Sequence, residues 1–446
     1  MIKSIRGTVD LFPDQKRLYN FITETGRKVC GKYGYRDMST PIIEPLELFT
    51  RSVGTESDIV MKEMYNFKDQ GGSMTCLRPE GTAGLMRAFI NDFNHTVQLP
   101  QRFFYAGPMF RYERPQRGRQ RQFEQLGCEL IGEDHYLADV ESIETSLQFL
   151  DSIGIDQSKI QLKINSLGDE ESRSNYLKSL KEYYASRLDQ LSADSKTRFE
   201  RGNFLRILDS KDENDRLINQ QAPNILDFLN VNSNQRFKNI LLNLEKGNIN
   251  YEIDQGLVRG LDYYSHTIFE VVTKSNGDSA AAAAASPPLA LLGGGRYDSL
   301  AKQLGYKGGA LPSIGWACGM ERLILNLGEN VVPKERLPLF LVTNNSGLVD
   351  DQQKEALTQQ SLDIVRSLRK ADQYVMTSEY QLLSGGNISK QLKRVSGRYQ
   401  SRYVIVVNSE SLQNQTVSIK DMLNHSQSDQ IPINTLDQQF NKLNNQ

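Results

Sequence analysis

The sequence predicts an α+β fold, in which an antiparallel sheet with flanking helices is interrupted by a helical insertion and followed by a C-terminal α/β domain. Residues 105–131 have the alternating pattern of two strands joined by a long basic loop, as in an antiparallel hairpin. Residues 169–247 are rich in Lys, Glu, Asp, Asn and Gln and carry apolar residues at helical spacing. From about Pro338, short strand and helix patterns alternate. These changes predict boundaries at 1–168, 169–247, 248–328, a linker at 329–337, and 338–446.

Length and composition favour a soluble, cytoplasmic protein of two or three domains. The chain has 446 residues and a net charge of −1, which argues against a general polyanion-binding surface but allows local basic patches. The start, "MIKSIRGTVDLFPDQ", has no apolar run of signal-peptide length, and no run of about twenty apolar residues occurs. Neither the four cysteines nor the four histidines have the spacing of a metal site, and no disulfide framework or protein-held metal is expected.

The first part of the chain is predicted to mix helices and strands. Apolar residues recur at helical spacing over residues 13–33, and "MSTPIIEPLELF" then has the pattern of a strand bounded by prolines. After the basic hairpin, "LADVESIETSLQFLDSIG" predicts a helix and "IQLKIN" predicts a strand. Residues 1–168 are therefore expected to supply much of the antiparallel sheet.

The middle of the chain is predicted to be helical before strands return. An amphipathic helix is indicated by four residues at four-residue steps, Tyr176, Leu180, Tyr184 and Leu188. Strand patterns follow in "YEIDQGLVRGLDYYSHTIFEVV" and "GGGRYDSL", and a helix is expected within "SIGWACGMERLILNL". The low-complexity tract Ser279 to Leu292, "SAAAAAASPPLALL", does not fit these patterns, and no function is assigned to it.

The C-terminal part alternates strands with helices. "LPLFLVT", "RYVIVVN" and "TVSIKDM" predict strands, and a helix is expected around residues 357–368. "LGENVVPKER" has the composition of a linker. Residues 338–446 should therefore form a compact α/β unit.

The hairpin carries polar residues on one face, which suggests a cavity. Side chains alternate across a strand, so Arg111 and Glu113 can face Gln125 and Glu129, while Leu126, Cys128 and Leu130 form an apolar face. Gly127 removes a side chain between Gln125 and Glu129, which predicts room for a small ligand. A solvated basic loop and a structural ladder of salt bridges are the alternatives.

Two further segments carry groups suited to binding. "TCLRPEGTAGLMR" places Glu80 and Thr82 on a turn before a helix, where a carboxylate and a hydroxyl can receive an ammonium group. The alternative is a simple cap of that helix. Arginine pairs two phosphate oxygens at once, and separate glycine-rich or strand contexts contain Arg111, Arg119, Arg259 and Arg322. Neither a GxxxxGK[ST] loop nor a GxGxxG loop after a strand is present.

These segments together resemble the histidyl-tRNA synthetases, which are class II aminoacyl-tRNA synthetases. "STPIIEPLELF", "FRYERPQRGRQRQFEQLGCELIG" and "GWACGMERLIL" are similar to motifs 1, 2 and 3 of the class, and Pro41 takes the place of the motif 1 proline. "LRPEGTAG", "GLVRGLDYYSHTIFE" and "GGGRYDSL" resemble elements particular to the histidine enzymes. The resemblance implies a class II catalytic domain, a helical insertion, a C-terminal anticodon-binding domain, and a homodimer formed through motif 1.

The resemblance also implies a role for each candidate residue. In the ATP site, Arg111 would hold the α-phosphate, Glu113 and Phe123 the adenine, and Arg119 and Arg322 the γ-phosphate. The histidine site would comprise Glu80, Thr82, Gln125, Glu129, Arg259, Tyr263 and Tyr264. Within it, Glu129 and Tyr264 would contact the imidazole. Arg259 and Arg111 would be catalytic, and Arg114 and Gln116 would face the acceptor end of tRNA(His).

The implied reaction is a two-step ligation with ATP and Mg²⁺. The histidine carboxylate attacks the α-phosphate and releases pyrophosphate, and the terminal ribose of the tRNA then takes the histidyl group. Positioning and charge neutralisation suffice for the first step, so no protein nucleophile is required. The alternative is a regulatory subunit of ATP phosphoribosyltransferase, a paralogue that senses histidine without aminoacylation. That paralogue lacks the anticodon domain and usually the "RGLDYY" stretch, and both are expected here.

Overall fold

A computed structural model describes residues 2–54, 57, 59–93, 97–258, 261, 263–274, 288–327, 337–370, 374–377, 387–399 and 401–444. The chain divides into two compact units, Met1–Val332 and Pro333–Gln446. The predicted linker, 329–337, lies outside the described residues except for its last residue, and most of the low-complexity tract lies outside them too.

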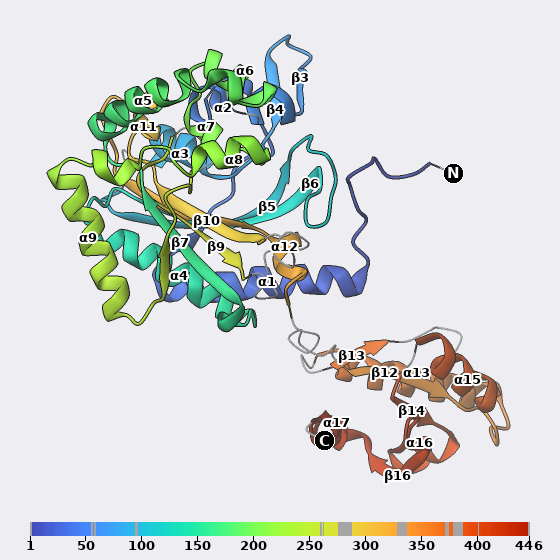
Figure 1. The fold of residues 1–446 in the computed structure, drawn as a ribbon. Helices are drawn as coiled ribbons and strands as arrows, with labels where there is room; N and C mark the ends of the chain where they lie inside the picture. Colours follow the sequence, from blue (N-terminus) through green and yellow to red (C-terminus); the bar gives the residue numbers. More distant parts are fainter. Residues whose placement is uncertain are drawn as a thin grey trace. The chain divides into compact units, whose positions relative to one another are not determined.

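An eight-stranded sheet forms the centre of the first unit (Figure 1). In spatial order its strands are β1 (Arg36–Asp37), β5 (Gln101–Phe110), β6 (Gln122–Ile131), β11 (Ser313–Gly319), β10 (Ala290–Arg296), β9 (Ser265–Thr273), β7 (Ile160–Ser166) and β8 (Tyr251–Ile253). All neighbours are antiparallel except β1 with β5 and β7 with β8, which pair in parallel at the two ends. The predicted antiparallel sheet with flanking helices is confirmed.

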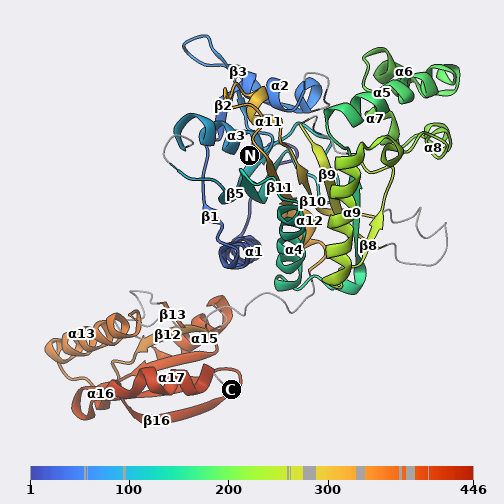
Figure 2. The same ribbon diagram turned by 90° about the vertical axis from the view of Figure 1, so that its left-hand side faces the viewer.

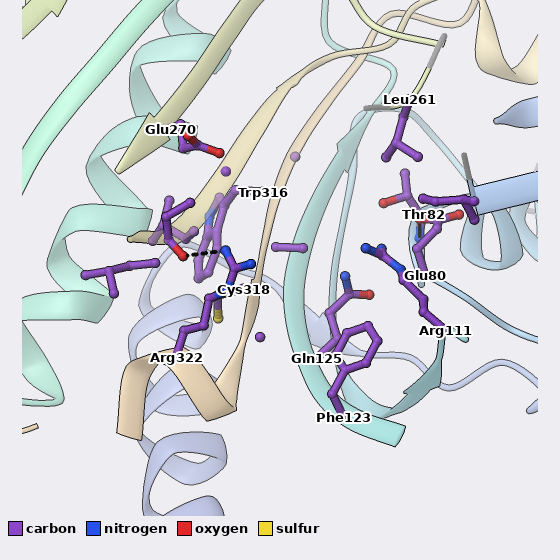
Figure 3. A pocket seen from close by; sticks show the side chains of 18 of the residues that line it. Glu80, Thr82, Arg111, Phe123, Gln125, Leu261, Glu270, Trp316, Cys318 and Arg322 are labelled. Atoms are coloured by element: carbon purple, nitrogen blue, oxygen red, sulfur yellow. Dashed lines mark hydrogen bonds between the residues drawn. The ribbon is translucent and has the colours of Figure 1, made fainter. Parts of the chain in front are cut away.

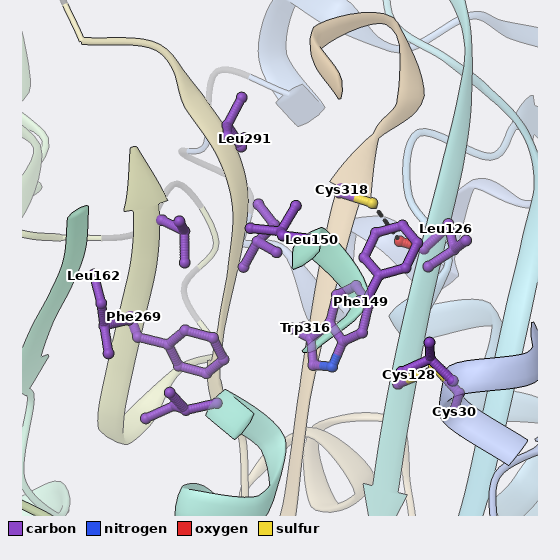
Figure 4. Close-up of a cluster of buried hydrophobic side chains, with 14 of the residues drawn as sticks. Cys30, Leu126, Cys128, Phe149, Leu150, Leu162, Phe269, Leu291, Trp316 and Cys318 are labelled. Atoms are coloured by element: carbon purple, nitrogen blue, oxygen red, sulfur yellow. Dashed lines mark hydrogen bonds between the residues drawn. The ribbon is translucent and has the colours of Figure 1, made fainter. Parts of the chain in front are cut away.

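Three long helices cover one face of this sheet, as Figures 1 and 2 both show: α1 (Pro13–Lys32), α4 (Leu137–Ser152) and α9 (Val231–Lys246). The main hydrophobic core lies between them and the sheet, where Phe149 stacks on Trp316 with ring centroids 5.4 Å apart (Figure 4). Leu126 and Cys128 enter this core, as the alternation along the hairpin predicted. Apolar packing on one face of the hairpin therefore holds it against the core, and its polar face can line a cavity.

Helices of the insertion other than α9, together with two short helices from other parts of the unit, pack on the opposite face. These helices are α3 (Thr82–Ala88), α5 (Glu170–Ala185), α6 (Ala193–Glu200), α7 (Leu205–Leu208), α8 (Glu213–Asn219) and α11 (Leu300–Gln303). Tyr176, Leu180 and Tyr184 are buried along α5 at the predicted four-residue steps, whereas Leu188 lies beyond the end of that helix. The same core contains Phe103 and Tyr105 from the sheet, so the insertion packs against the wall of the polar face.

The proline-bounded segment is only partly a strand, which corrects the prediction. Strand β2 (Ile43–Pro45) ends at Pro45, and "LELF" begins helix α2 (Leu46–Ser52). Proline has no N–H for a strand ladder, and the residues after it include no β-branched side chain until Thr50. Leu48 and Phe49 are buried in a local core instead. Strand β2 remains an edge of a small sheet whose order is β2, β4 (Met74–Leu77), β3 (Asn66–Lys68).

The second unit is a five-stranded sheet with helices. The strands lie in the order β13 (Tyr374–Thr377), β12 (Leu337–Thr343), β14 (Tyr403–Val407), β15 (Thr416–Asp421) and β16 (Ser426–Pro432). The helices are α13 (Asp351–Leu368), α15 (Ile388–Tyr399), α16 (Ser409–Asn414) and α17 (Leu436–Asn444). Leu339 and Leu341 enter one core and Phe340 and Val342 the other, so both faces of β12 are buried. This is the α/β pattern that the sequence predicted.

Candidate active site

The polar face of the β5–β6 hairpin opens into a cavity of about 330 Å³ in the first unit. Antiparallel pairing sets Gly107 opposite Gln125 and Phe103 opposite Glu129, so these positions share one face. Residues predicted from the sequence line the cavity: Glu80, Thr82, Arg111, Glu113, Arg119, Phe123, Gln125, Glu129, Tyr263, Tyr264 and Arg322. Segments up to about 240 residues apart in the sequence thus contribute to one site (Figure 3).

Glu129 is the most deeply enclosed acidic group of the site, with 1% of its surface exposed. Its Oε1 accepts a hydrogen bond from Thr82 Oγ1 at 2.7 Å, and its Oε2 accepts one from the Tyr297 hydroxyl. An added methyl group at Gly315 on β11 would overlap this carboxylate, so glycine is required there. Burial raises the pKa of Glu129 to about 8, although both hydroxyl donors act in the opposite direction.

Glu80 caps helix α3 and also lines the cavity. Its two carboxylate oxygens accept hydrogen bonds from the backbone N–H groups of Thr82 at 2.6 Å and Ala83 at 2.8 Å. Burial raises its pKa, and these two amide donors oppose the effect. Gln125 Oε1 accepts a hydrogen bond from Gly81 N at 3.0 Å, which ties the same turn to β6. The helix-cap alternative is therefore correct for Glu80, but each carboxylate oxygen keeps a further lone pair for a ligand donor.

Gly127 does not provide the predicted space for a ligand. An added Cβ at Gly127 would lie 2.5 Å from the Tyr105 hydroxyl oxygen and 2.6 Å from the ring carbon that bears it. The Tyr105 ring also occupies the space that a side chain at Gly81 would need. The missing side chains of these two glycines therefore accommodate a tyrosine of the protein itself.

A paired set of charges lies on the loop side of the cavity. Glu113 contacts Arg119 at 3.0 Å and Arg111 at 3.8 Å, so part of the salt-bridge alternative is correct. Arg111 also donates from Nε to the carbonyl of Pro79 at 2.9 Å, and its guanidinium carbon lies 5.3 Å from the Phe123 ring centroid. Two arginines and an aromatic ring are thereby held together beside the cavity.

Arg322 lies across the cavity from Glu80 and Thr82 (Figure 3). It belongs to helix α12 (Met320–Ile324), and its Nη1 donates to the carbonyl of Ala290 at 2.9 Å. Burial lowers its pKa, and the nearby Arg119 adds to the effect. Among the described residues no carboxylate lies within 4 Å of its nitrogens. A cationic site with this environment is suited to an anionic ligand.

The remaining predicted residues fall outside the cavity wall or outside the described chain. Arg114 and Gln116 are exposed in the loop between β5 and β6 and do not line the cavity. Arg259 lies outside the described residues. Tyr263 and Tyr264, by contrast, line the cavity. Tyr263 is packed against Tyr297 with ring centroids 5.7 Å apart, and Arg173 of α5 donates to the Tyr264 carbonyl at 3.2 Å.

Sequence reasoning missed several polar residues of the site, among them Tyr297 and Glu270; Gln120 and Glu321 also line the cavity. Tyr297 lies within the quoted segment "GGGRYDSL" and was given no role. Glu270 is on β9, where it occupies one position of an alternating strand. Tyr297 and Glu270 reach the cavity because the strands lie in the order β6, β11, β10, β9 in the sheet. No local sequence pattern specifies this order.

Comparisons with known proteins agree on one family. The family model described as Histidyl-tRNA synthetase matches residues 7–323. A probable mitochondrial histidine–tRNA ligase of Dictyostelium discoideum is 48% identical over 98% of this chain and 87% of its own. The histidine–tRNA ligase of Rhodospirillum rubrum is 41% identical over 94% of each chain.

Solved structures share the fold of this chain. The structure of apo histidyl-tRNA synthetase from S. aureus superimposes with a TM-score of 0.75 at 30% identity, covering 98% of both chains. A Bacillus halodurans structure described as an ATP phosphoribosyltransferase regulatory subunit/histidyl-tRNA synthetase shares the fold at a TM-score of 0.61 and 20% identity, over 92% of this chain. Family match, sequence identity across both units and superposition together show that this chain belongs to the histidyl-tRNA synthetase family.

Proposed function

We propose that this protein is a histidine–tRNA ligase whose two chemical substrates meet in the 330 Å³ cavity. It would activate histidine with ATP and then transfer the histidyl group to tRNA(His). The observation that carries this proposal is the composition of the cavity wall. A buried carboxylate held by two hydroxyls, Glu129, shares one cavity with the guanidinium groups of Arg111, Arg119 and Arg322.

We assign the binding of histidine to the part of the cavity lined by the buried carboxylates and the tyrosines. Glu129 faces the imidazole, because a buried acidic group that already receives two hydroxyl hydrogen bonds is well placed to accept a ring N–H. Tyr263 and Tyr264 complete the aromatic wall. The substrate ammonium group would lie by Glu80, Thr82 and Gln125, where Glu80 supplies the opposite charge.

The ATP end is assigned to the hairpin and α12. Phe123 stacks on the adenine, Glu113 accepts from its amino group, and Arg111 holds the α-phosphate. Arg119 and Arg322 take the γ-phosphate. Arg119 is paired with Glu113, and ATP binding would exchange this carboxylate partner for a phosphate, which leaves Glu113 available to the base.

Arg259 and Arg111 are proposed as the catalytic residues of the first step. Their charges would neutralise the negative charge that grows on the α-phosphate oxygens as the histidine carboxylate attacks. In the second step Arg114 and Gln116, which are exposed on the loop beside the cavity, would position the acceptor end of the tRNA.

Magnesium fits this site as a companion of the ATP phosphates. Mg²⁺ bound with nucleotides takes one or two carboxylates and completes its coordination with phosphate and water oxygens. The described residues contain no group of three or more potential metal-ligating side chains, but Glu270 offers a single carboxylate on the wall near Arg322 (Figure 3). When bound, the ion would neutralise phosphate charge.

The proposal extends to the assembly and location of the protein. The second unit would bind the anticodon, and two copies would associate through the β2 region. There Ile43 and Phe67 lie on the same face of the small sheet with 53% and 41% of their surfaces exposed. A cytoplasmic location is supported by four free cysteines and is testable by cell fractionation. Within the described part of the chain, no helix is both long and apolar enough to cross a membrane.

Histidine-dependent exchange between ATP and labelled pyrophosphate tests the proposal. Purified protein should catalyse exchange with histidine and not with the other amino acids, and should then charge tRNA(His). A regulatory paralogue would bind histidine without exchange. Histidine binding with no exchange at saturating ATP and Mg²⁺ would therefore favour that alternative and refute the ligase.

A further inference from the structure

The N-terminal segment, residues 2–12, contacts the loop between β5 and β6 at Gly7. Gly7 O accepts a hydrogen bond from the backbone N–H of Arg121 at 2.7 Å. Of residues 2–10, only Gly7 and Thr8 are not exposed to solvent. Gly7 lies within a turn that is closed by a hydrogen bond from Thr8 N to Ile5 O at 2.9 Å. The segment therefore meets the loop at Gly7.

Glycine is required at that contact for two reasons. Gly7 has a φ of +86°, a conformation that residues with a side chain rarely adopt. An added Cβ would lie 2.8 Å from Arg121 Cγ, 3.0 Å from Arg121 Cδ and 3.0 Å from Pro115 Cγ. The backbone of the segment thus lies directly against two residues of the loop.

Arg121 connects this contact to the binding residues of the loop. Its carbonyl accepts from Arg111 N at 2.9 Å, and its Nε donates to the Glu113 carbonyl at 3.4 Å. Its guanidinium carbon lies 3.7 Å from the Tyr112 ring centroid. A displacement of Arg121 therefore moves the backbone at positions 111 and 113.

The loop has a second support on its other side. Gly118, with φ +71°, packs so closely on helix α12 that an added Cβ would lie 3.1 Å from both Arg322 Cγ and Leu325 Cδ1. The base of the N-terminal segment is fixed as well, because Phe12 N donates to Gln15 Oε1 at 3.2 Å and α1 packs on the main core. The loop is thus held between α12 and a segment that is anchored in the body of the unit.

We propose that the N-terminal segment is a positioning element for the ATP- and tRNA-binding loop, and that Gly7 is its positioning residue. This rests on the proposed function for the roles of Glu113, Arg114, Gln116 and Arg119. By fixing Arg121, Gly7 sets where these side chains meet ATP and the tRNA acceptor end. The proposed histidine contacts lie on β6, on α3, in the turn before it and in the segment before β9, and none of them belongs to this loop.

The test compares Gly7→Ala with Gly72→Ala in the full-length protein. Gly72 also has a φ of +86°, but an added Cβ there meets nothing within 4 Å, so this control reproduces the backbone strain without the contact. Relative to Gly72→Ala, we expect Gly7→Ala to raise KM for ATP and for tRNA about tenfold through misplaced loop groups. KM for histidine and the melting temperature should match the control.

The Arg121→Ala variant provides a second, independent test of the contact. Because the Arg121 side chain is the nearest obstacle to a Cβ at position 7, adding Gly7→Ala to Arg121→Ala should change KM for ATP by less than twofold. Amide hydrogen exchange at Arg121 should also become faster in Gly7→Ala than in Gly72→Ala, and this measurement needs no activity.

The outcomes separate this inference from the proposed function. KM values for ATP and tRNA within twofold of the control, with unchanged exchange at Arg121, would overturn the positioning role. A parallel change of all three KM values together with a lower melting temperature would also overturn it, since that pattern indicates general destabilisation. A wild-type protein without pyrophosphate exchange would refute the ligase, while hydrogen exchange would still decide whether Gly7 holds the loop.

Discussion

Replacement of Glu129 by glutamine should change how the stability of the protein depends on pH. The side chain is 1% exposed and its pKa is raised by burial to about 8, from an ordinary value near 4.5. The native state therefore holds this proton more tightly than the unfolded state does. The resulting stabilisation is complete below about pH 4.5 and is lost as the pH rises toward 8.

The size of the effect follows from the pKa difference. One pKa unit corresponds to about 1.36 kcal/mol between the two protonation states, so the full effect has an upper bound of roughly 5 kcal/mol. Between pH 6.0 and 7.5 the wild type should lose about 2 kcal/mol of unfolding free energy that Glu129→Gln, which cannot titrate, keeps. Urea unfolding of both proteins without ligand, at several pH values in this range, measures the difference.

The same variant tests the proposed contact with the imidazole. Glutamine keeps the shape but cannot ionise when the imidazole binds, so the affinity for histidine should fall by roughly 1–3 kcal/mol. Glu47→Gln is the matched control, since that side chain is exposed and pairs only with Arg51 among the described residues. If the difference in unfolding free energy between wild type and Glu129→Gln is independent of pH, the buried-acid reasoning is wrong. Unchanged histidine affinity would remove Glu129 from the imidazole site.

Three further predictions concern the assembly, the two units and the reaction. Sedimentation at micromolar concentration should give a dimer, because Ile43 on the edge strand β2 and Phe67 on β3 are exposed on one face of the small sheet; a stable monomer of about 50 kDa would contradict this. Deletion from about Leu337 should leave adenylate formation largely intact and reduce transfer to tRNA, since the cavity lies in the first unit; equal loss of both activities would argue against it. Arg259→Ala should slow adenylate formation on the order of 10²–10³-fold with little change in melting temperature, and Arg259→Lys should restore little. A folded Arg259→Ala variant within a few-fold of the wild-type rate would show that Arg259 is not catalytic.

Much of the site could be predicted because it depends on strand alternation. Alternation alone placed Gln125 and Glu129 on one face of β6 and Leu126 and Cys128 on the other, and the strand pairing agrees. The distance from Arg111 to Glu113 was not predictable in this way, because both follow the end of β5. Their contacts with Arg119 depend on the path of the loop.

Other features depended on contacts between distant segments. The prediction that Gly127 leaves room for a ligand was wrong. A glycine shows where a side chain is missing but does not show what fills the space, and here Tyr105 of the neighbouring strand fills it. The role of Tyr297 was missed because its hydroxyl reaches Glu129 only through the order of the strands in the sheet. The end of β2 at Pro45 was missed because the apolar pattern continues without interruption into α2.

The close fit of Tyr105 against Gly81 and Gly127 has a consequence for altering amino-acid specificity. Tyr105 and Gly81 line a second cavity of about 170 Å³, while the neighbouring Glu80 and Thr82 line the first, so at the second cavity the tyrosine ring packs against the turn that carries these two residues. A smaller residue at position 105 would enlarge the second cavity toward this turn without replacing Glu80 or Glu129. Conversely, any side chain introduced at position 127 would have to be accompanied by a smaller residue at position 105. Engineering of this pocket should therefore vary positions 81, 105 and 127 as one set, and related sequences should show correlated substitutions among them.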